Sequence, residues 1–289
     1  MRYYIIGLFV CLFLASCKDA NRKYAESVCQ EWQHKEVLFP ERLVFSIYGK
    51  DTVDYSIKDS EYKIVTYVDS AGCTSCKLNL PRWASLIRQV DSISPRSVEF
   101  MFFFFPKEGR DIYHTLRIEK FDYPVCIDVS DSFNQLNHLP VDDRFRTFLL
   151  DKENKVIAIG NPVHNPKIKE IYLDIISGKE SIPKKEEVTT KVEVSSMQID
   201  FGNFDWEDVQ TSAFSLQNTG EHPLIVQDII TSCGCTTVEY SKEPVPFGKS
   251  LDIKVTYKAE HPEHFNKTIT VYCNAEESPL QLKIQGNAK

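Results

Sequence analysis

The sequence predicts an α/β domain followed by an all-β sandwich, because the hydrophobic pattern changes once along the chain. In 37–176, predicted strands and helices alternate, which is typical of an α/β layer fold. In 193–288, short segments alternate apolar and polar residues, with turn residues between them, as in a β-sandwich. The stretch 177–192 is rich in charge and contains glycine and proline, so we interpret it as a linker.

The elements of the α/β domain are predicted from the periodicity of apolar residues and from the turn residues between the periodic segments. A first hairpin is predicted over 43–57, and a second over 145–159. The run Val98–Phe105 is almost continuously apolar, which indicates a strand covered on both faces. Other strands are predicted over 62–68 and 123–127, and helices over 80–90, 109–118, 131–139 and 167–176.

The β-sandwich prediction depends on three runs with a period of two. Apolar residues alternate over 251–257, 269–273 and 280–284. Each run would bury one face and expose the other. The inward positions include Cys273.

The N-terminus has the pattern of a secretory signal. A basic start precedes an apolar stretch too short to span a bilayer, and Leu14-Ala-Ser-Cys17 follows. This segment resembles the lipobox of bacterial lipoproteins, which implies removal of 1–16 and acylation of Cys17. We therefore expect a lipid-anchored protein of the cell envelope, extracytoplasmic on the inner or outer membrane, with 17–36 as a tether. The alternative is an ordinary secretory signal with an accidental cysteine.

Composition and motifs exclude several functions. The chain has 34 basic and 41 acidic residues and a net charge of −7, which argues against nucleic acid as a partner. The glycine-rich, P-loop, zinc-protease and serine-hydrolase motifs are all missing from the sequence. We therefore expect no cofactor and no metal, and a protein partner in the envelope.

Cys73 and Cys76 carry the strongest chemical signal. They form a Cys-x-x-Cys pair between the predicted strand 62–68 and the predicted helix from residue 80. The N–H groups at a helix N-terminus stabilise a thiolate, and a second thiol in reach closes a disulfide. This spacing therefore points to thiol–disulfide exchange.

The domain 37–176 resembles the thioredoxin-like superfamily, and within it the membrane-tethered thiol-disulfide reductase-like branch. The resemblance rests on the cysteine pair after a strand, on Pro81 five residues later, and on the hairpin run Thr147–Val156. It implies that Cys73 is the attacking thiolate and that Cys76 resolves the mixed disulfide. Asp69 is a candidate to accept a proton from Cys76, although a solvated loop aspartate is the alternative.

Two positions depart from that family. Gly72 stands where thioredoxins usually carry tryptophan, and Phe145 with Arg146 stands where they have a cis-proline and a threonine. A cis bond before a non-proline residue costs roughly 3–4 kcal/mol, so we expect a trans bond before Phe145 and an altered docking edge. A structural disulfide or a vestigial site thus remains open beside redox activity.

A second cysteine cluster lies in the predicted sandwich. The runs Phe214–Gly220, Ser232-Cys-Gly-Cys-Thr236 and Thr268–Asn274 resemble a family of unknown function with an Ig-like, PapD/Hydin-type sandwich. That resemblance implies a fold and no established activity.

Cys233 and Cys235 leave three interpretations. They could form a disulfide, with Gly234 taking the φ values that bring them together. They could bind a soft metal with His261 and His264. We favour a structural corner in which either thiol is free or paired to Cys273.

The leading functional hypothesis is a thiol-disulfide oxidoreductase-like envelope lipoprotein whose Ig-like module binds a partner. The rival is a non-catalytic scaffold or binding lipoprotein that retains the thioredoxin-like fold. Of the other cysteines, Cys126 is expected to be a small core residue, and the sequence names no partner for Cys29.

Overall fold

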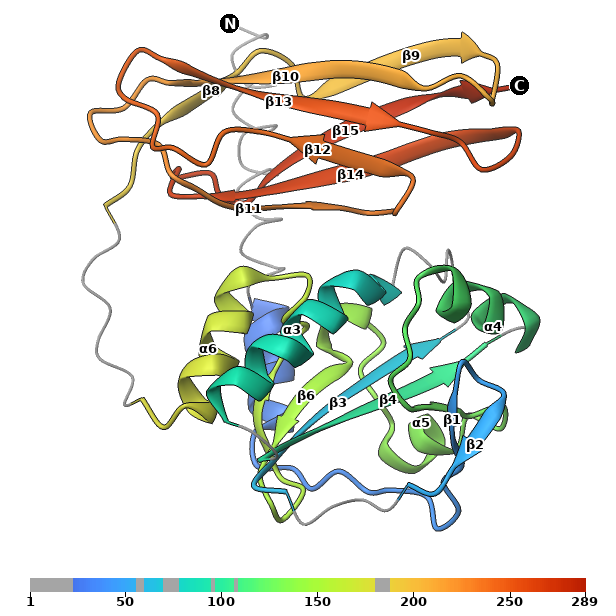
Figure 1. Cartoon of the computed structure of the whole chain (residues 1–289). Helices are drawn as coiled ribbons and strands as arrows, with labels where there is room; N and C mark the ends of the chain where they lie inside the picture. The colour runs from blue at the N-terminus through green and yellow to red at the C-terminus, as the bar shows by residue number, and fades with distance from the viewer. Residues whose placement is uncertain (1–22, 56–59, 70–77, 95–96, 107–108, 180–187) are drawn as a thin grey trace, which may run out of the picture. The chain divides into compact units, whose positions relative to one another are not determined.

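The computed structural model describes residues 23–55, 60–69, 78–94, 97–106, 109–179 and 188–289. The chain divides into two compact units (Figure 1). The unit named here the α/β unit comprises Met1–Asp69 and Ile87–Ser177, and the β unit comprises Ser70–Leu86 and Gly178–Lys289.

A seven-stranded sheet in the order β2-β1-β5-β4-β3-β6-β7 forms the centre of the α/β unit. Strands β3, β4 and β5 are parallel neighbours, and the remaining pairs are antiparallel. The strands are β1 (Phe45–Ile47), β2 (Asp51–Val53), β3 (Tyr62–Asp69), β4 (Val98–Phe105), β5 (Val125–Ile127), β6 (Thr147–Leu150) and β7 (Val156–Ile159). The expected α/β class is therefore present in this part of the chain.

Burial explains why β3 and β4 are central. Seven consecutive residues of β4 are buried, which confirms that this apolar run is covered on both faces. The helices are α3 (Leu80–Ile93), α4 (Gly109–Ile118), α5 (Ser132–Asn137) and α6 (Pro166–Ile176). Helix α6 starts where Asn165 accepts hydrogen bonds from the backbone N–H groups of Lys167 and Ile168, with Pro166 as the first helical residue.

Residues 23–37 correct the tether that the sequence predicts over 17–36. Residues 23–32 are helical, and Val28, Trp32 and Val37 are buried in the core of the α/β unit. The Trp32 ring stacks on Phe148 of β6 at 4.8 Å between centroids. Glu36 forms a β-bridge with Lys155. This unit therefore begins upstream of residue 37.

Two predicted strands are shorter than the sequence suggests. Strand β5 begins at Val125, after Pro124, which has no N–H to donate to a ladder. Strand β6 begins at Thr147, because Asp143–Phe145 form a 3₁₀ turn. The Asp142 side chain caps this turn by accepting a hydrogen bond from the backbone N–H of Arg144.

The β unit holds two four-stranded sheets, in the orders β12-β13-β10-β8 and β11-β14-β15-β9. Neighbours are antiparallel except β9 and β15, which are parallel. The strands are β8 (Val192–Val194), β9 (Gln198–Phe204), β10 (Gln210–Asn218), β11 (Val226–Thr231), β12 (Thr236–Glu239), β13 (Ser250–Tyr257), β14 (Glu263–Cys273) and β15 (Leu280–Ala288). The expected all-β class is present here.

One core joins the two sheets of the β unit. The inward residues of β13 alternate as the sequence predicts, and Tyr257 stacks on Phe265 of β14 at 3.8 Å between ring centroids. Because these strands belong to different sheets, the contact lies across the sandwich.

Asn218 and Gly220 show why the Asn-Thr-Gly run has these residues. The fully buried Asn218 side chain accepts from Thr190 Oγ1 at 2.8 Å and donates to the carbonyls of His222 and Val245, each at 2.8 Å. A Cβ atom on Gly220 would lie 2.4 Å from the backbone nitrogen of Lys191. Only glycine fits this close approach.

Within the described residues, no helix combines the length and the apolar character needed to cross a membrane.

Candidate thiol–disulfide sites

The predicted lipidation site Cys17 and the predicted redox pair Cys73 and Cys76 lie outside the described residues. The flanks of the pair are described. Strand β3 ends at Asp69, and helix α3 begins at Leu80 after Asn79, which has a left-handed backbone (φ 41°). Asparagine tolerates this conformation well, and Pro81 follows within the first turn of α3, where proline is accepted. The sequence expectation of a helix here is confirmed over Leu80–Ile93.

Asp69, the candidate proton acceptor, forms an ion pair with Arg146. Both side chains are mostly buried, with 21 % and 14 % of their surfaces exposed. The two residues are 77 positions apart in sequence and meet because β3 and β6 are antiparallel neighbours. The solvated loop aspartate considered as the alternative is therefore not what the structure has.

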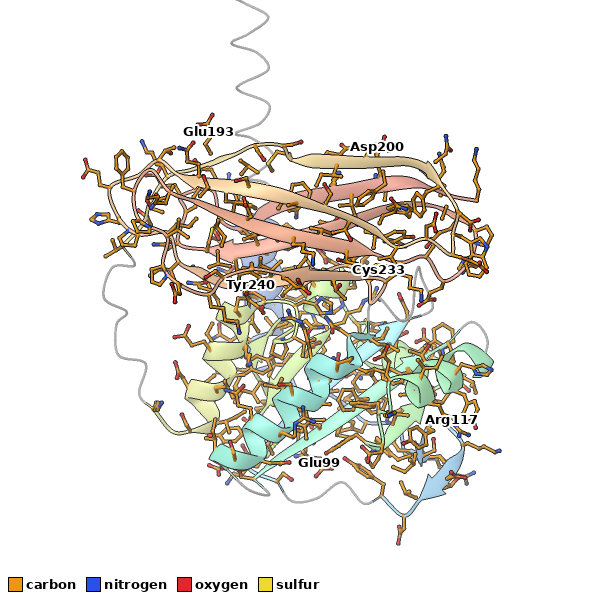
Figure 2. The ribbon with its side chains drawn as sticks, turned by 45° about the horizontal axis from the view of Figure 1, so that its top comes forward. Glu99, Arg117, Glu193, Asp200, Cys233 and Tyr240 are labelled. Atoms are coloured by element: carbon orange, nitrogen blue, oxygen red, sulfur yellow. A yellow bond between two sulfur atoms is a disulfide. The ribbon has the colours of Figure 1, made fainter. Side chains whose placement is uncertain are left out.

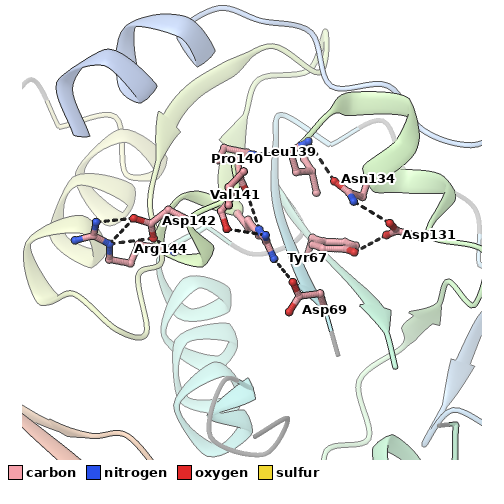
Figure 3. Close-up of polar contacts among 10 residues, drawn as sticks. Tyr67, Asp69, Asp131, Asn134, Leu139, Pro140, Val141, Asp142 and Arg144 are labelled. Atoms are coloured by element: carbon pink, nitrogen blue, oxygen red, sulfur yellow. Dashed lines mark hydrogen bonds and ion pairs between the residues drawn. The ribbon is translucent and has the colours of Figure 1, made fainter. Parts of the chain in front are cut away.

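The Arg146 guanidinium makes further contacts that fix its position. Its Nε donates to the Pro140 carbonyl at 2.7 Å, and Nη2 donates to the Val141 carbonyl at 2.8 Å. The guanidinium carbon lies 5.8 Å from the centroid of the Tyr67 ring. Figure 3 shows the contacts around Asp69, Pro140 and Val141. Sequence reasoning singled out Arg146 as a departure, but did not predict its partners.

Tyr67 extends this cluster toward α5. Its hydroxyl donates to the Asp131 carboxylate, and the other Asp131 oxygen accepts from Asn134 at 2.8 Å (Figure 3). Burial raises the pKa of Tyr67 well above its usual range, and the hydrogen bond to the anionic Asp131 carboxylate is the second cause of the increase. Tyr67 therefore stays protonated and acts here as a donor.

The position that corresponds to the cis-proline has a trans peptide bond before Phe145. Among the described residues the cis peptide bond is the one before Pro279. The expectation of a trans bond at Phe145 is thus confirmed. Its neighbour Arg146, with the ion pair described above, directly precedes β6, an inner strand of the sheet.

In the β unit, Cys233 and Cys235 form a disulfide, the first of the three interpretations (Figure 2). Their Cα atoms are 5.3 Å apart, well inside the range that a disulfide spans. The favoured interpretation of a structural corner is right about the backbone, because 233–235 are a turn between β11 and β12, and wrong about the sulfurs, which are bonded to each other and are neither free nor paired to Cys273. Gly234 has no left-handed φ, so the turn closes without that freedom.

Cys273 is a free, buried cysteine at the end of β14. Burial raises the pKa of its thiol, which makes the neutral form dominant. It lies on the inward face, as its alternation with Ile269 and Val271 predicts. Sequence reasoning grouped Cys273 with Cys233 and Cys235, but Cys273 forms no disulfide with either of them.

The metal interpretation of Cys233 and Cys235 also fails, because sulfurs joined in a disulfide are not thiolate ligands. The Nδ1 atom of His264 lies 2.7 Å from the Asn287 side-chain oxygen. Across the part of the chain that the structure describes, no cluster of three or more histidine, cysteine or acidic side chains is arranged to hold a metal ion.

The two remaining described cysteines are free. Cys126 in β5 is a buried core residue, as expected, and burial raises the pKa of its thiol to about 11. Cys29 is exposed on the helix over 23–32.

Residues 192–288 match the family model described as "Protein of unknown function (DUF1573)". This range covers the strands β8 to β15 of the β unit. The family match therefore concerns the β unit alone. A comparison with curated proteins found no match.

Solved structures give distant likenesses. A protein of unknown function from Porphyromonas gingivalis W83 is 21 % identical with a TM-score of 0.33, over 36 % of this chain and 50 % of that one. A proposed thiol-disulfide oxidoreductase from Bacteroides vulgatus is 16 % identical with a TM-score of 0.36, over 48 % of this chain and 88 % of that one. A PapD-like domain of human CEP192 is 14 % identical with a TM-score of 0.29, over 38 % and 93 %.

The chain thus spans half the length of the Porphyromonas gingivalis protein. The identities and TM-scores of all three structures are low.

Proposed function

We propose that this chain is a thiol-disulfide oxidoreductase-like protein of the cell envelope, anchored by lipid on Cys17, which exchanges disulfides through Cys73 and Cys76. In this proposal Cys73 attacks the disulfide of an envelope protein, and Cys76 resolves the mixed disulfide. The β unit, with its Ig-like arrangement, would bind that protein partner.

One observation carries the proposal. The Cys-x-x-Cys sequence begins four residues after Asp69, the last residue of the central strand β3, and ends four residues before Leu80, the first residue of α3. A segment between a buried strand and a helix N-terminus is where a cysteine gains thiolate character. The strand order β4-β3-β6-β7 around it, with β3 and β4 parallel and the other pairs antiparallel, supports a thioredoxin-like assignment.

The Asp69–Arg146 pair adds a feature to the proposed site. The Arg146 guanidinium and the Asp69 carboxylate form an ion pair without net charge at the end of β3, and Asp69 lies four residues before Cys73 in the sequence. In the proposal, Arg146 holds Asp69, the candidate proton acceptor for Cys76, in a fixed position.

The test is reduction of a protein disulfide such as that of insulin by the full chain in detergent, with dithiothreitol as electron source. We expect turnover above the dithiothreitol background, and loss of that excess in Cys73→Ser. Cys126→Ser is the matched control, because it removes a buried thiol that the mechanism does not use. Equal turnover by the unmodified chain and by Cys73→Ser would contradict the proposal.

A second candidate function is a non-catalytic scaffold or binding lipoprotein. The observation that favours it is Arg146 at the edge where the thioredoxin-like family has the cis-proline loop that guides substrate backbone. Cys76→Ser in cells would separate the two functions. A mixed disulfide with an envelope protein would favour exchange, and no trapped partner would favour the scaffold.

A further inference from the structure

The proposed function gives no role to the Cys233–Cys235 disulfide, which lies in the turn between β11 and β12 of the β unit. A disulfide can serve as a staple or as a group that exchanges with thiols. Four features of the described residues separate these two roles: the size of the closed loop, the other bonds that hold the turn, the burial of each cysteine, and the hydrogen-bond donor beside one sulfur.

The closed loop is too small to make the disulfide an effective staple. It joins residues only two positions apart. A cross-link stabilises a fold chiefly by restricting the unfolded chain, and this effect grows with the number of residues in the loop. A bond across one intervening residue therefore contributes close to the least that a disulfide can.

Hydrogen bonds already hold the turn on both sides. Before the disulfide, Ser232 N–H donates to the Thr268 carbonyl at 2.9 Å, and Thr268 N–H donates to Ser232 Oγ at 2.9 Å. After it, Lys258 N–H donates to the Cys235 carbonyl at 3.0 Å. The first pair ties the turn to β14, and the last bond lies beside β13. The crossover between the two sheets can therefore persist without the S–S bond.

The two cysteines differ in access. Cys233 is 5 % exposed, whereas Cys235 is partly exposed. Gly234 between them is exposed, and a Cβ built on it would meet no atom within 4 Å. An incoming thiolate therefore reaches Cys235 more readily than Cys233.

The buried sulfur has a hydrogen-bond donor beside it. Thr236 Oγ1 lies 3.2 Å from Cys233 Sγ, and Thr236 is itself only 3 % exposed. A disulfide sulfur has no proton, so the hydroxyl donates. The same hydrogen bond stabilises the thiolate that forms when the S–S bond breaks. A stabilised leaving thiolate speeds exchange.

We propose that Cys233–Cys235 is a second thiol–disulfide exchange site, which accepts two electrons from a dithiol protein and is attacked at Cys235. The incoming thiolate forms a bond to Cys235 Sγ, and the electron pair of the broken S–S bond passes to Cys233 Sγ beside Thr236. The second thiol of the donor then attacks the mixed disulfide and releases the Cys235 thiolate. The donor dithiol is oxidised to a disulfide, and both chain thiolates take protons from solvent.

The test uses the full chain with Cys73→Ser and Cys76→Ser, so that failure of the proposed function does not affect it. Native protein is incubated with glutathione, a monothiol that halts the reaction at the mixed disulfide. Free thiols are then trapped by acid quench and alkylation, and the peptides are mapped by mass spectrometry. We expect glutathione on Cys235 and the alkyl group on Cys233. Glutathione on Cys233, or a disulfide that reacts only after denaturation, would overturn the proposal.

Thr236→Val tests the leaving group. It removes the hydroxyl and keeps the shape, and we expect reduction by dithiothreitol to slow about three- to tenfold. Thr237→Val, the exposed neighbour on β12, is the matched control and should leave the rate unchanged. Equal rates for both variants would mean that Thr236 does not stabilise the leaving thiolate. If Thr236→Val does not fold, the site of glutathione addition still decides the proposal.

Discussion

Arg146 is the residue whose surroundings explain most about the proposed Cys73 site. It replaces a small polar residue of the thioredoxin-like pattern, and its guanidinium is bonded to one carboxylate and two backbone carbonyls. A mostly buried charge is tolerated only when its donors are used, and here three are. Removing the guanidinium leaves Asp69 without this partner in a mostly buried position.

Arg146→Ala is therefore expected to lower the free energy of unfolding by about 2–4 kcal/mol, because it leaves a mostly buried carboxylate without its guanidinium. Arg144→Ala is the matched control. Arg144 pairs with Asp142 but its side chain is 60 % exposed, so the loss should stay below about 1 kcal/mol. Urea unfolding of both variants measures the difference, and equal losses would mean that the Asp69–Arg146 pair contributes no more than a surface pair.

Among the elements, the helix over 23–32 shows that the α/β unit begins upstream of residue 37. Most of its residues are polar, and in the sequence only Val28 and Trp32 indicate an apolar face of a helix. Burial of Trp32 against Phe148 and the backbone bonds from His34 to Val156 and from Val37 to Asn154 attach it to the β6–β7 hairpin. The segment is therefore an element of the fold.

Trp32→Ala is expected to cost about 3–5 kcal/mol of unfolding free energy, the usual loss for a buried aromatic residue. Glu31→Ala, at an exposed position on the same helix, should change stability by no more than about 0.5 kcal/mol.

In line with this, a chain that starts at Lys23 should unfold cooperatively at the same urea concentration as the full chain, and a chain that starts at Val37 should unfold at a lower urea concentration. Identical midpoints for the two shortened chains would mean that residues 23–36 do not stabilise the fold, as expected of a tether.

The turn residues of the β unit give a second test at this scale. Gly220→Ala places a methyl group against the backbone of Lys191, so we expect a loss of about 1–3 kcal/mol. Gly234→Ala, where the space is open and φ is not left-handed, should fold with unchanged thermal stability. Thermal unfolding followed by circular dichroism compares them. A greater loss at Gly234 would mean that the Cys233–Cys235 turn needs its glycine.

These elements also show what sequence could and could not predict. Alternation and apolar runs depend on neighbours in sequence, so β4, α3, β13 and the two hairpins were predictable. The Asp69–Arg146 pair joins residues 77 positions apart, and no periodicity reports such a contact. The Cys233–Cys235 bond was left open because an extended strand and a turn give different Cα separations, and the sequence does not fix which one forms.

At the scale of the whole molecule, the chain has two units with different kinds of sulfur chemistry. The β unit carries a closed disulfide whose two cysteines differ in exposure. The α/β unit leads, through β3, to the proposed redox pair. Its described cysteines are Cys126, which is buried with a raised pKa that keeps it protonated at neutral pH, and Cys29, whose pKa is also raised by burial. On this account, reactivity at the α/β unit's end of β3 belongs to Cys73.

The most direct test of the central claim is the pH dependence of Cys73 alkylation in the full chain with Cys76→Ser, read by mass spectrometry of the peptide that contains it. The account predicts a half-maximal rate at a pH well below that of glutathione, because the N–H groups at a helix N-terminus stabilise a thiolate. A titration that coincides with glutathione, or a thiol that reacts only in denaturant, would contradict the claim.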